Sequence, residues 1–343
     1  MGRAALRIID PCAPRAYADP DSLHRLGGTE ATVLRIARVL TDEYEVSVEQ
    51  SARDTTEAVG DVRFAPMRLG RTYGGTILVI NSWKAALICR RHNPQARILV
   101  WQHVEPGQNL RALAGVMAAA QIGIVAVSET FAAQLRRFAG AAKLPVFAIA
   151  NPIADDLHPD ATPRDRDLLF FASAPHKGLD QVLAAFATLR ATVPALRLEV
   201  ADPGYLDWDC GAMPEGVTVL GTLPHAAVIA RMRQALCVFY PQTSFAETFG
   251  LVIAEANAVG CPVLVHRGLG ANDEVASDAS QCIDATDPQM IAARIAAWRQ
   301  SPPAITGNPR FRQSAVVQDW RHFLGAARRV RRSARSKGVS HVA

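Results

Sequence analysis

Short apolar runs alternate with longer amphipathic stretches through the first 150 residues. The apolar, β-branched runs predict buried strands, and the Ala-, Leu- and Arg-rich stretches between them predict helices. The expected strands are Leu6–Asp10, Tyr44–Glu49, Thr76–Asn81, Arg97–His103, Gly123–Ser128 and Val146–Ala150. The expected helices are Ala31–Leu40, Ala85–Arg91, Ala112–Ala120 and Thr130–Phe138. Because such alternation is typical of parallel sheets with crossover helices, this half is expected to be an α/β domain.

A Pro- and charge-rich stretch, residues 158–167, interrupts the alternation of predicted strands and helices, which then resumes. Further strands are expected at Leu168–Ser173, Ala195–Asp202, Val217–Leu220 and Leu236–Tyr240, with a helix at Leu179–Arg190. The predicted organisation is a first α/β domain at 1–158, a linker at 159–167, a second α/β domain at 168–310, a helix at 311–330 and a tail at 331–343. Two such domains leave a cleft between their carboxyl strand ends, where these folds usually bind ligands.

Composition supports two domains. The chain has 343 residues, of which 49% are hydrophobic, and this is enough apolar material for two cores. Its 37 Lys and Arg exceed its 32 Asp and Glu. From Arg321 onward there are seven basic residues and no acidic ones, so the rest of the chain carries a slight acidic excess. A nucleic-acid-binding body is therefore not expected.

The cysteines and the apolar runs indicate the cellular location of the protein. Six cysteines are scattered singly without a C-x-x-C pair, a pattern expected in a reducing, cytosolic compartment. Arg3 and Arg7 interrupt any apolar run at the start, so no secretory signal is predicted. No stretch approaches the roughly 20 apolar residues that cross a bilayer. We expect a cytoplasmic protein, with peripheral contact at the inner face of the membrane as an extension.

The stretch from residue 237 to residue 260 carries the most chemical information. It predicts a strand, a polar loop at Thr243–Thr248 and a helix that begins near Phe249. Free backbone N–H groups at such a helix start favour a diphosphate. Glu247 and Glu255, eight residues apart, lie roughly 80° apart around a helix and can line one pocket. A carboxylate can accept two hydrogen bonds from a sugar diol. In the alternative interpretation, Glu247 only caps the helix and Glu255 faces water.

The segment E-T-F-G-L-V-I-A-E-A, with its Glu-x7-Glu spacing, resembles the signature of glycosyltransferase family 4. This family has the GT-B fold: two Rossmann-like α/β domains face each other across a cleft, and a C-terminal helix returns to the N-terminal domain. Its members are retaining enzymes that use nucleotide sugars. The resemblance implies that Glu255 holds the ribose and Glu247 contacts the donor sugar. It also implies that the amides of Thr248, Phe249 and Gly250 meet the diphosphate.

Three further segments lie where this family has functional ones. The pair Gly27-Gly28 after the first strand resembles the family's glycine loop, and adjacent glycines let a backbone approach a phosphate or sugar closely. His103 ends a strand where the family often has a histidine that touches the donor sugar. Lys177, in a Lys-Gly segment before a helix, is expected to neutralise the departing phosphate. Ser128 and Asn151 also end strands, but they are interpreted as turn-forming residues rather than ligand-binding ones.

The sequence departs from the family pattern beside Lys177. The usual arginine of this segment is absent, and Ser173 and Ala174 stand in its neighbourhood. Three explanations stay open: Lys177 acts alone, another cation such as His176 or Arg267 compensates, or catalysis is weak or lost. Further along, the loop that contains Glu274 matches the family only loosely, so Glu274 is given no role.

Two Asp-x-Asp triplets raise the question of a metal. The pairs Asp165/Asp167 and Asp207/Asp209 are interpreted as solvated turn clusters, the first in the interdomain linker. No other motif requires a metal, so no metal site and no cofactor are predicted. The nucleotide sugar is a co-substrate.

The C-terminal region predicts a helix and a basic tail. Val316, Val317, Trp320, Phe323 and Leu324 follow a helical period, in agreement with a helix that returns to the N-terminal domain. Two interpretations of the tail stay open. It contacts anionic lipid head groups at about 1 kcal/mol per cation, or it is a disordered solubilising segment.

The sequence thus predicts a glycosyltransferase that moves a hexosyl group from a UDP- or GDP-sugar to a hydroxyl of a glycan or lipid-linked acceptor. Nucleic acid is not an expected partner. The alternatives are a non-catalytic, glycosyltransferase-like partner subunit, which the missing arginine suggests, and a sugar-nucleotide epimerase on the same fold.

Overall fold

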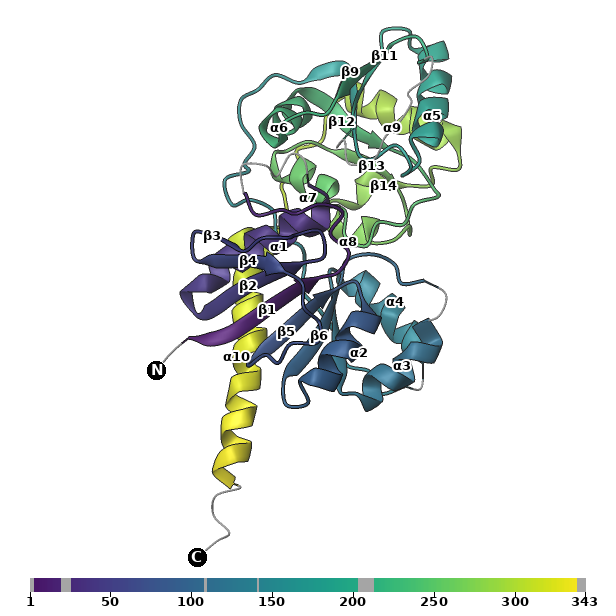
Figure 1. Cartoon of the computed structure of the whole chain (residues 1–343). Coiled ribbons are helices and arrows are strands. Elements are labelled where there is room, and N and C mark those ends of the chain that lie inside the picture. The colour runs from purple at the N-terminus through teal and green to yellow at the C-terminus, as the bar shows by residue number, and fades with distance from the viewer. Residues whose placement is uncertain (1–2, 20–25, 108–109, 141, 203–212, 338–343) are drawn as a thin grey trace, which may run out of the picture.

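A computed structural model of the protein describes residues 3–19, 26–107, 110–140, 142–202 and 213–337. It contains two sheets that follow one another along the chain and lie in separate halves of the molecule (Figure 1). Both are built mainly from parallel strands with helices between them, so the predicted α/β architecture of two parallel-sheet domains is confirmed.

The first sheet has eight strands in the order β3-β4-β2-β1-β5-β6-β7-β8, parallel except for the β3–β4 pair. The strands are β1 (Ala4–Asp10), β2 (Tyr44–Gln50), β3 (Glu57–Val59), β4 (Val62–Pro66), β5 (Thr76–Ile80), β6 (Arg97–Gln102), β7 (Ile122–Ala126) and β8 (Val146–Ala148). The helices among them are α1 (Gly28–Val39), α2 (Trp83–His92), α3 (Leu110–Ala119) and α4 (Glu129–Ala139), with a 3-10 turn, η2 (Leu40–Asp42). Central strands such as β7 are buried along their whole length, which explains their continuous apolar sequence.

The second sheet has six strands in the order β11-β10-β9-β12-β13-β14, all in parallel pairs. The strands are β9 (Asp165–Ala172), β10 (Arg197–Ala201), β11 (Val217–Gly221), β12 (Ala235–Tyr240), β13 (Val263–His266) and β14 (Cys282–Ile283). The helices are α5 (Leu179–Thr192), α6 (His225–Gln234), α7 (Leu251–Ala258), α8 (Asn272–Val275) and α9 (Pro288–Gln300), with 3-10 turns η3 (Ala279–Gln281) and η4 (Pro309–Phe311). Cys237 in β12 is fully buried, as expected of a small core residue.

The interdomain segment differs in one place from the sequence-based prediction. Strand β9 already begins at Asp165, so Asp165 and Asp167 belong to a sheet and not to the expected linker turn. Each carboxylate has an arginine partner, Arg197 for Asp165 and Arg299 for Asp167. These pairs neutralise the two acids, which the apolar pattern alone had placed before the strand.

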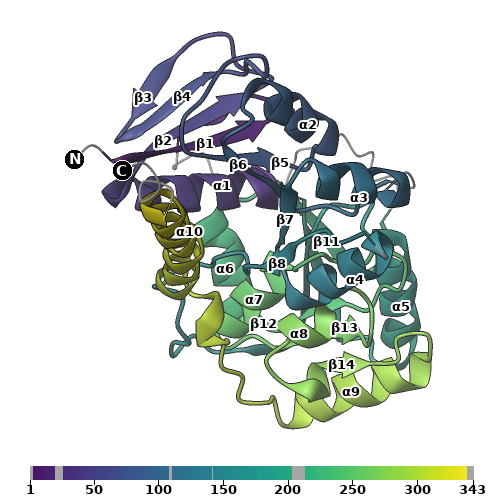
Figure 2. The same cartoon turned by 90° about the horizontal axis from the view of Figure 1, so that it is seen from below.

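The last helix, α10 (Gln313–Lys337), returns to the first domain and runs beside α1 (Figures 1 and 2). Its Trp320 is fully buried, and its ring centroid lies 4.8 Å from that of Trp101 in β6. Arg97 donates a hydrogen bond to the Phe323 carbonyl over 3.1 Å. The expected return of the C-terminal helix is therefore confirmed. The helix also continues to Lys337, seven residues beyond its predicted end at 330, and so includes part of the expected basic tail.

Candidate functional site

The loop after β12 and the short helix α7 form one wall of the site. Gly250 caps α7 with a φ of 93°, a left-handed conformation that glycine adopts without strain. On the neighbouring loop, Gly178 has a φ of 87°, and a Cβ there would lie 2.6 Å from Cβ of Gln242. Only a glycine lets these two loops approach so closely. The approach brings Lys177 next to Glu247.

Lys177 and Glu247 form an ion pair inside the site. The Lys177 Nζ lies 3.0 Å from Oε1 and 3.2 Å from Oε2 of Glu247. The Tyr240 hydroxyl donates to the same carboxylate over 3.2 Å, and the Phe245 ring lies 4.6 Å from the ammonium. These contacts hold a positive charge at the carboxyl end of the second sheet, where it can meet an anionic group.

Glu255 is buried in α7 and has two cationic neighbours. His225, the first residue of α6, lies 2.9 Å from its Oε1, and Arg35 of α1 lies 3.7 Å from the same atom. Burial raises the pKa of Glu255, but the hydrogen bond and charge of His225, together with Arg35, outweigh burial and hold the pKa below its ordinary value. The hydrogen bond and charge of Glu255 in turn raise the pKa of His225. Glu255 is thus an ionised acceptor.

His103 directly follows β6 and is 5% exposed. Within the described residues neither of its ring nitrogens has a hydrogen-bond partner, and burial lowers its pKa to about 3. The imidazole is therefore neutral, with one donor and one acceptor nitrogen. Its backbone is anchored twice: the amide donates to Asn81 Oδ1 over 2.6 Å, and the carbonyl accepts from the Thr248 hydroxyl over 2.6 Å. The second bond joins the two domains.

A cleft of about 820 Å³ brings most of the predicted residues together. The predicted residues that line it are Gly27, Gly28, His103, Lys177, Glu247, Thr248 and Glu255. Among the described residues, Phe249 and Gly250 do not line it: Phe249 is buried with its ring centroid 5.1 Å from that of Phe311, and Gly250 caps the helix. The Phe249 ring therefore serves packing, and Gly250 sets the direction of the chain at the start of α7.

The cations considered as substitutes for the missing arginine have different positions. His176 lines the cleft, but burial and the neighbouring Lys177 lower its pKa, which favours the neutral ring. Arg267 donates to the Cys282 carbonyl over 2.8 Å and does not line this cleft in the described part of the chain. Ser173 and Ala174 do line it, as uncharged groups.

Two contacts that sequence reasoning missed join the domains beside the site. The Glu274 carboxylate accepts from the amides of Glu129 and Thr130, 2.9 and 2.7 Å away, at the start of α4. Ser128 donates to the Thr248 carbonyl over 2.6 Å. No local pattern indicated these contacts, or those of Arg35 and His225, because the partners are far apart in the sequence.

Among the described residues, no group of three or more His, Cys, Asp or Glu side chains could hold a metal ion. The triplet Asp207/Asp209 lies outside the described residues. No helix in the described parts has the length and apolar character to cross a membrane.

Comparisons with known proteins agree on the fold. Residues 160–310 match the family model "Glycosyl transferases group 1". A D-inositol 3-phosphate glycosyltransferase of Thermomonospora curvata is 33% identical over 156 residues, which are 41% of this chain and 36% of that protein. The chain thus spans little more than a third of the length of this curated relative.

Two solved structures extend the comparison to nearly the whole chain. A sucrose-phosphate synthase from Thermosynechococcus elongatus has a TM-score of 0.68 at 16% identity and covers 98% of this chain and 100% of its own. A UDP-forming α,α-trehalose-phosphate synthase from Burkholderia vietnamiensis has a TM-score of 0.66 at 11% identity, covering 94% and 100%. At these identities the likeness concerns the fold, and it confirms the two-domain GT-B arrangement.

Proposed function

We propose that this protein is a nucleotide-sugar-dependent glycosyltransferase. It moves a hexosyl group from a UDP- or GDP-sugar to a hydroxyl of a glycan or lipid-linked acceptor, with retention of anomeric configuration, as in glycosyltransferase family 4. The observation that carries the proposal is the shared cleft, in which Lys177, the carboxylates of Glu247 and Glu255, and the neutral imidazole of His103 face one volume. The family model that matches residues 160–310 and the inositol phosphate glycosyltransferase similarity support the same reaction class.

Each group has a role that suits its chemistry. The ionised Glu255 accepts hydrogen bonds from the ribose hydroxyls of the donor. Lys177 and the backbone amide of Thr248, which both line the cleft, stabilise the charge that develops on the diphosphate as the sugar–oxygen bond breaks. His103 offers its unpaired ring nitrogens to the hydroxyls of the transferred sugar, and Glu247 orients both that sugar and Lys177. The glycines of the Gly27-Gly28 loop leave room for the diphosphate or the acceptor.

Because the usual arginine is absent, Lys177 is the side chain that stabilises the negative charge on the leaving diphosphate. His176 is held mainly neutral and Arg267 bonds elsewhere, so neither replaces the arginine. In the donor complex, Lys177 exchanges part of its contact with Glu247 for the phosphate. An ion pair of partly exposed groups permits this exchange because its net free energy is small.

The test is transfer from radiolabelled UDP- and GDP-sugars to a membrane lipid extract. Lys177→Ala is expected to lower kcat by about 100- to 1,000-fold, because it removes charge stabilisation that acts in the transition state. Glu255→Gln is expected to weaken nucleotide binding by about tenfold, measured by calorimetry. Lys84→Ala, an exposed lysine of α2 outside the cleft, is the matched control.

The outcomes separate the alternatives. Nucleotide release that requires the lipid extract supports the transferase, and NMR of the product's anomeric proton tests retention. Radiolabel that is recovered in a different nucleotide sugar, without transfer to the acceptor, indicates an epimerase. Nucleotide binding with no turnover across the panel indicates a non-catalytic partner subunit. Unchanged kinetics in both variants would reject the assignment of Lys177 and Glu255.

The membrane-side location is part of the same proposal. A lipid-linked acceptor requires contact with the cytoplasmic face, for which the six basic residues from Arg328 to Lys337 are suited. Arg321 is not among them, because it pairs with Asp42 and Glu43. Sedimentation with anionic and with neutral vesicles tests this point, and equal recovery with both would contradict it.

A further inference from the structure

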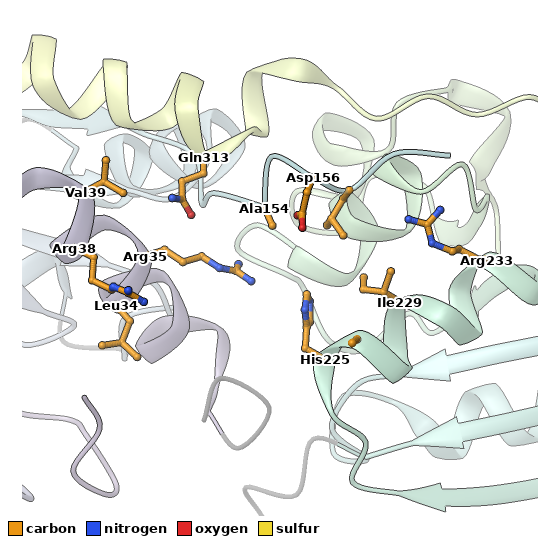
Figure 3. A pocket seen from close by; sticks show the side chains of 12 residues that line it. Leu34, Arg35, Arg38, Val39, Ala154, Asp156, His225, Ile229, Arg233 and Gln313 are labelled. Atoms are coloured by element: carbon orange, nitrogen blue, oxygen red, sulfur yellow. The ribbon is translucent and has the colours of Figure 1, made fainter. Parts of the chain in front are cut away.

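A second cavity of about 780 Å³ lies between α1 and α6 (Figure 3), next to the cleft. Arg35 and His225 line both spaces and therefore lie where the two adjoin. The remaining walls come from the segment at 154–157 and from Gln313 at the start of α10. The cavity thus uses elements from both domains but none of the residues proposed to hold the donor diphosphate.

The lining is strongly cationic. Three guanidinium groups line it, those of Arg35, Arg38 and Arg233, against one carboxylate, Asp156. In Figure 3, Arg35 extends from α1 toward His225, Arg38 lies beside it on the same helix, and Arg233 lies on the opposite wall. Because fixed cations in a concave, partly desolvated space reinforce one another's potential, this arrangement favours an anion.

The cations differ in how far they are already neutralised. Arg35 lies 3.7 Å from Glu255 and donates to the Pro152 carbonyl over 3.0 Å. Arg233 lies 2.8 Å from Asp160. Arg38, by contrast, makes no hydrogen bond or ion pair of its guanidinium among the described residues, and it is exposed. A planar guanidinium without a partner at a cavity is suited to bidentate binding of a phosphate.

Helix α6 adds to the positive potential. Its first two residues, His225 and Ala226, line the cavity, and its cap residue Pro224 provides no side-chain hydrogen bond. The start of a ten-residue helix carries a partial positive charge from its free amides. Leu34, Leu157 and Ile229 add apolar surface to the lining. This combination fits a phosphate or diphosphate carried on an organic group better than a small bare ion.

We propose that the α1–α6 cavity is a second anion site, distinct from the donor cleft, that binds a phosphate-bearing ligand between Arg38, Arg35 and Arg233. The ligand chemistry is a phosphomonoester or diphosphate. Its source is either a soluble metabolite or a lipid head group, and the experiment separates the two. The site goes beyond the proposed function, because phosphate binding here does not depend on any transfer reaction.

The test is calorimetric titration of the full chain with pyrophosphate in a Lys177→Ala background, which weakens competing binding in the donor cleft. Pyrophosphate binding is expected to persist in the Lys177→Ala variant. Adding Arg38→Glu is expected to weaken it by at least about tenfold, because a charge-assisted contact becomes a repulsion. Arg91→Glu, the same change at an exposed arginine of α2 outside the cavity, is the matched control and is expected to leave binding unchanged.

Vesicles identify the source of the phosphate. Binding to vesicles that contain phosphatidic acid but not to phosphatidylcholine alone, and its loss with Arg38→Glu but not Arg91→Glu, indicates a lipid head group. Pyrophosphate binding without such vesicle binding indicates a soluble ligand. Pyrophosphate binding that disappears with Lys177→Ala, or that is insensitive to Arg38→Glu, would overturn the second site. Loss of transferase activity in Lys177→Ala has no bearing on this outcome, so the two proposals fail independently.

Discussion

Arg35 of the first domain lies 3.7 Å from the buried carboxylate of Glu255 in the second domain. The two side chains are 11% and 8% exposed, so little solvent screens this pair. The carboxylate proposed to hold the donor ribose is thus also a contact between the domains. The proposed donor contact and the contact between the domains therefore share one side chain.

Removal of Arg35 is expected to destabilise the protein. In Arg35→Ala, the buried Glu255 keeps His225 but loses its second cation, and the Pro152 carbonyl loses a donor. We expect the free energy of unfolding to fall by about 1–3 kcal/mol, the cost of leaving buried polar groups undersatisfied. Urea denaturation measures the change, with Arg91→Ala as the control. A loss below about 0.5 kcal/mol in Arg35→Ala would show that the interface does not depend on this pair.

The His225–Glu255 bond predicts a pH dependence of stability. Glu255 raises the pKa of His225 above its ordinary value of 6.5, although burial and Arg35 oppose the shift; Asp156 is a further acidic neighbour. A raised folded-state pKa contributes stability that is fully present below the unfolded pKa and is lost as pH rises through the folded pKa. The stability gap between the wild type and His225→Gln is therefore expected to shrink with rising pH. Urea titrations from about pH 6 to about pH 9 measure it, and a gap that grows with pH would contradict the shift.

His103 predicts opposite effects on stability and activity. Its buried ring nitrogens have no partner among the described residues, so they lower the stability of the unliganded protein. We expect His103→Leu to raise the free energy of unfolding by about 1 kcal/mol and to lower transfer by about tenfold, because the apolar side chain needs no partner but cannot bond a sugar hydroxyl. Thermal denaturation and transfer assays measure both, with His92→Leu on α2 as the control. A fall in stability with unchanged transfer would make His103 a packing residue.

The Glu274 contact predicts an interface effect. Its carboxylate accepts two amides at the start of α4 and interacts favourably with the positive end of that helix. Glu274→Ala is expected to lower the free energy of unfolding by about 1 kcal/mol, as for the loss of a helix cap. Asp61→Ala, an exposed carboxylate in the turn between β3 and β4, is the control. Equal stability of the two variants would show that solvent replaces the contact without cost.

Much of the architecture was predictable because its causes are local. Strand β12 is a continuous apolar run and the return helix α10 follows a helical period of apolar residues, and each pattern indicates its element whatever lies around it. The start of β9 was misplaced because Asp165 and Asp167 are acidic, and local polarity suggested a turn. Their partners, Arg197 and Arg299, neutralise them from positions that no local pattern reveals.

The site likewise has a part that the sequence predicted and a part that it did not. The resemblance of one short segment identified Glu247 and Glu255 as candidates, and that of a second segment identified Lys177. A strand end at the position of the family's histidine identified His103. What those residues contact was not predictable: Arg35 and His225 gave no signal, although both touch Glu255.

By itself, the sequence determined the alternation of strands and helices, the presence of two parallel-sheet domains and the residue types available for chemistry. Only the tertiary structure decided that Arg35 neutralises Glu255 across the domain interface, that His103 is buried without a partner among the described residues, and that a cationic cavity lies next to the cleft. The physical reason is distance along the chain. Periodicity and turn chemistry act over a few residues, whereas the charge, burial and hydrogen bonding of a side chain depend on groups that folding brings from hundreds of residues away.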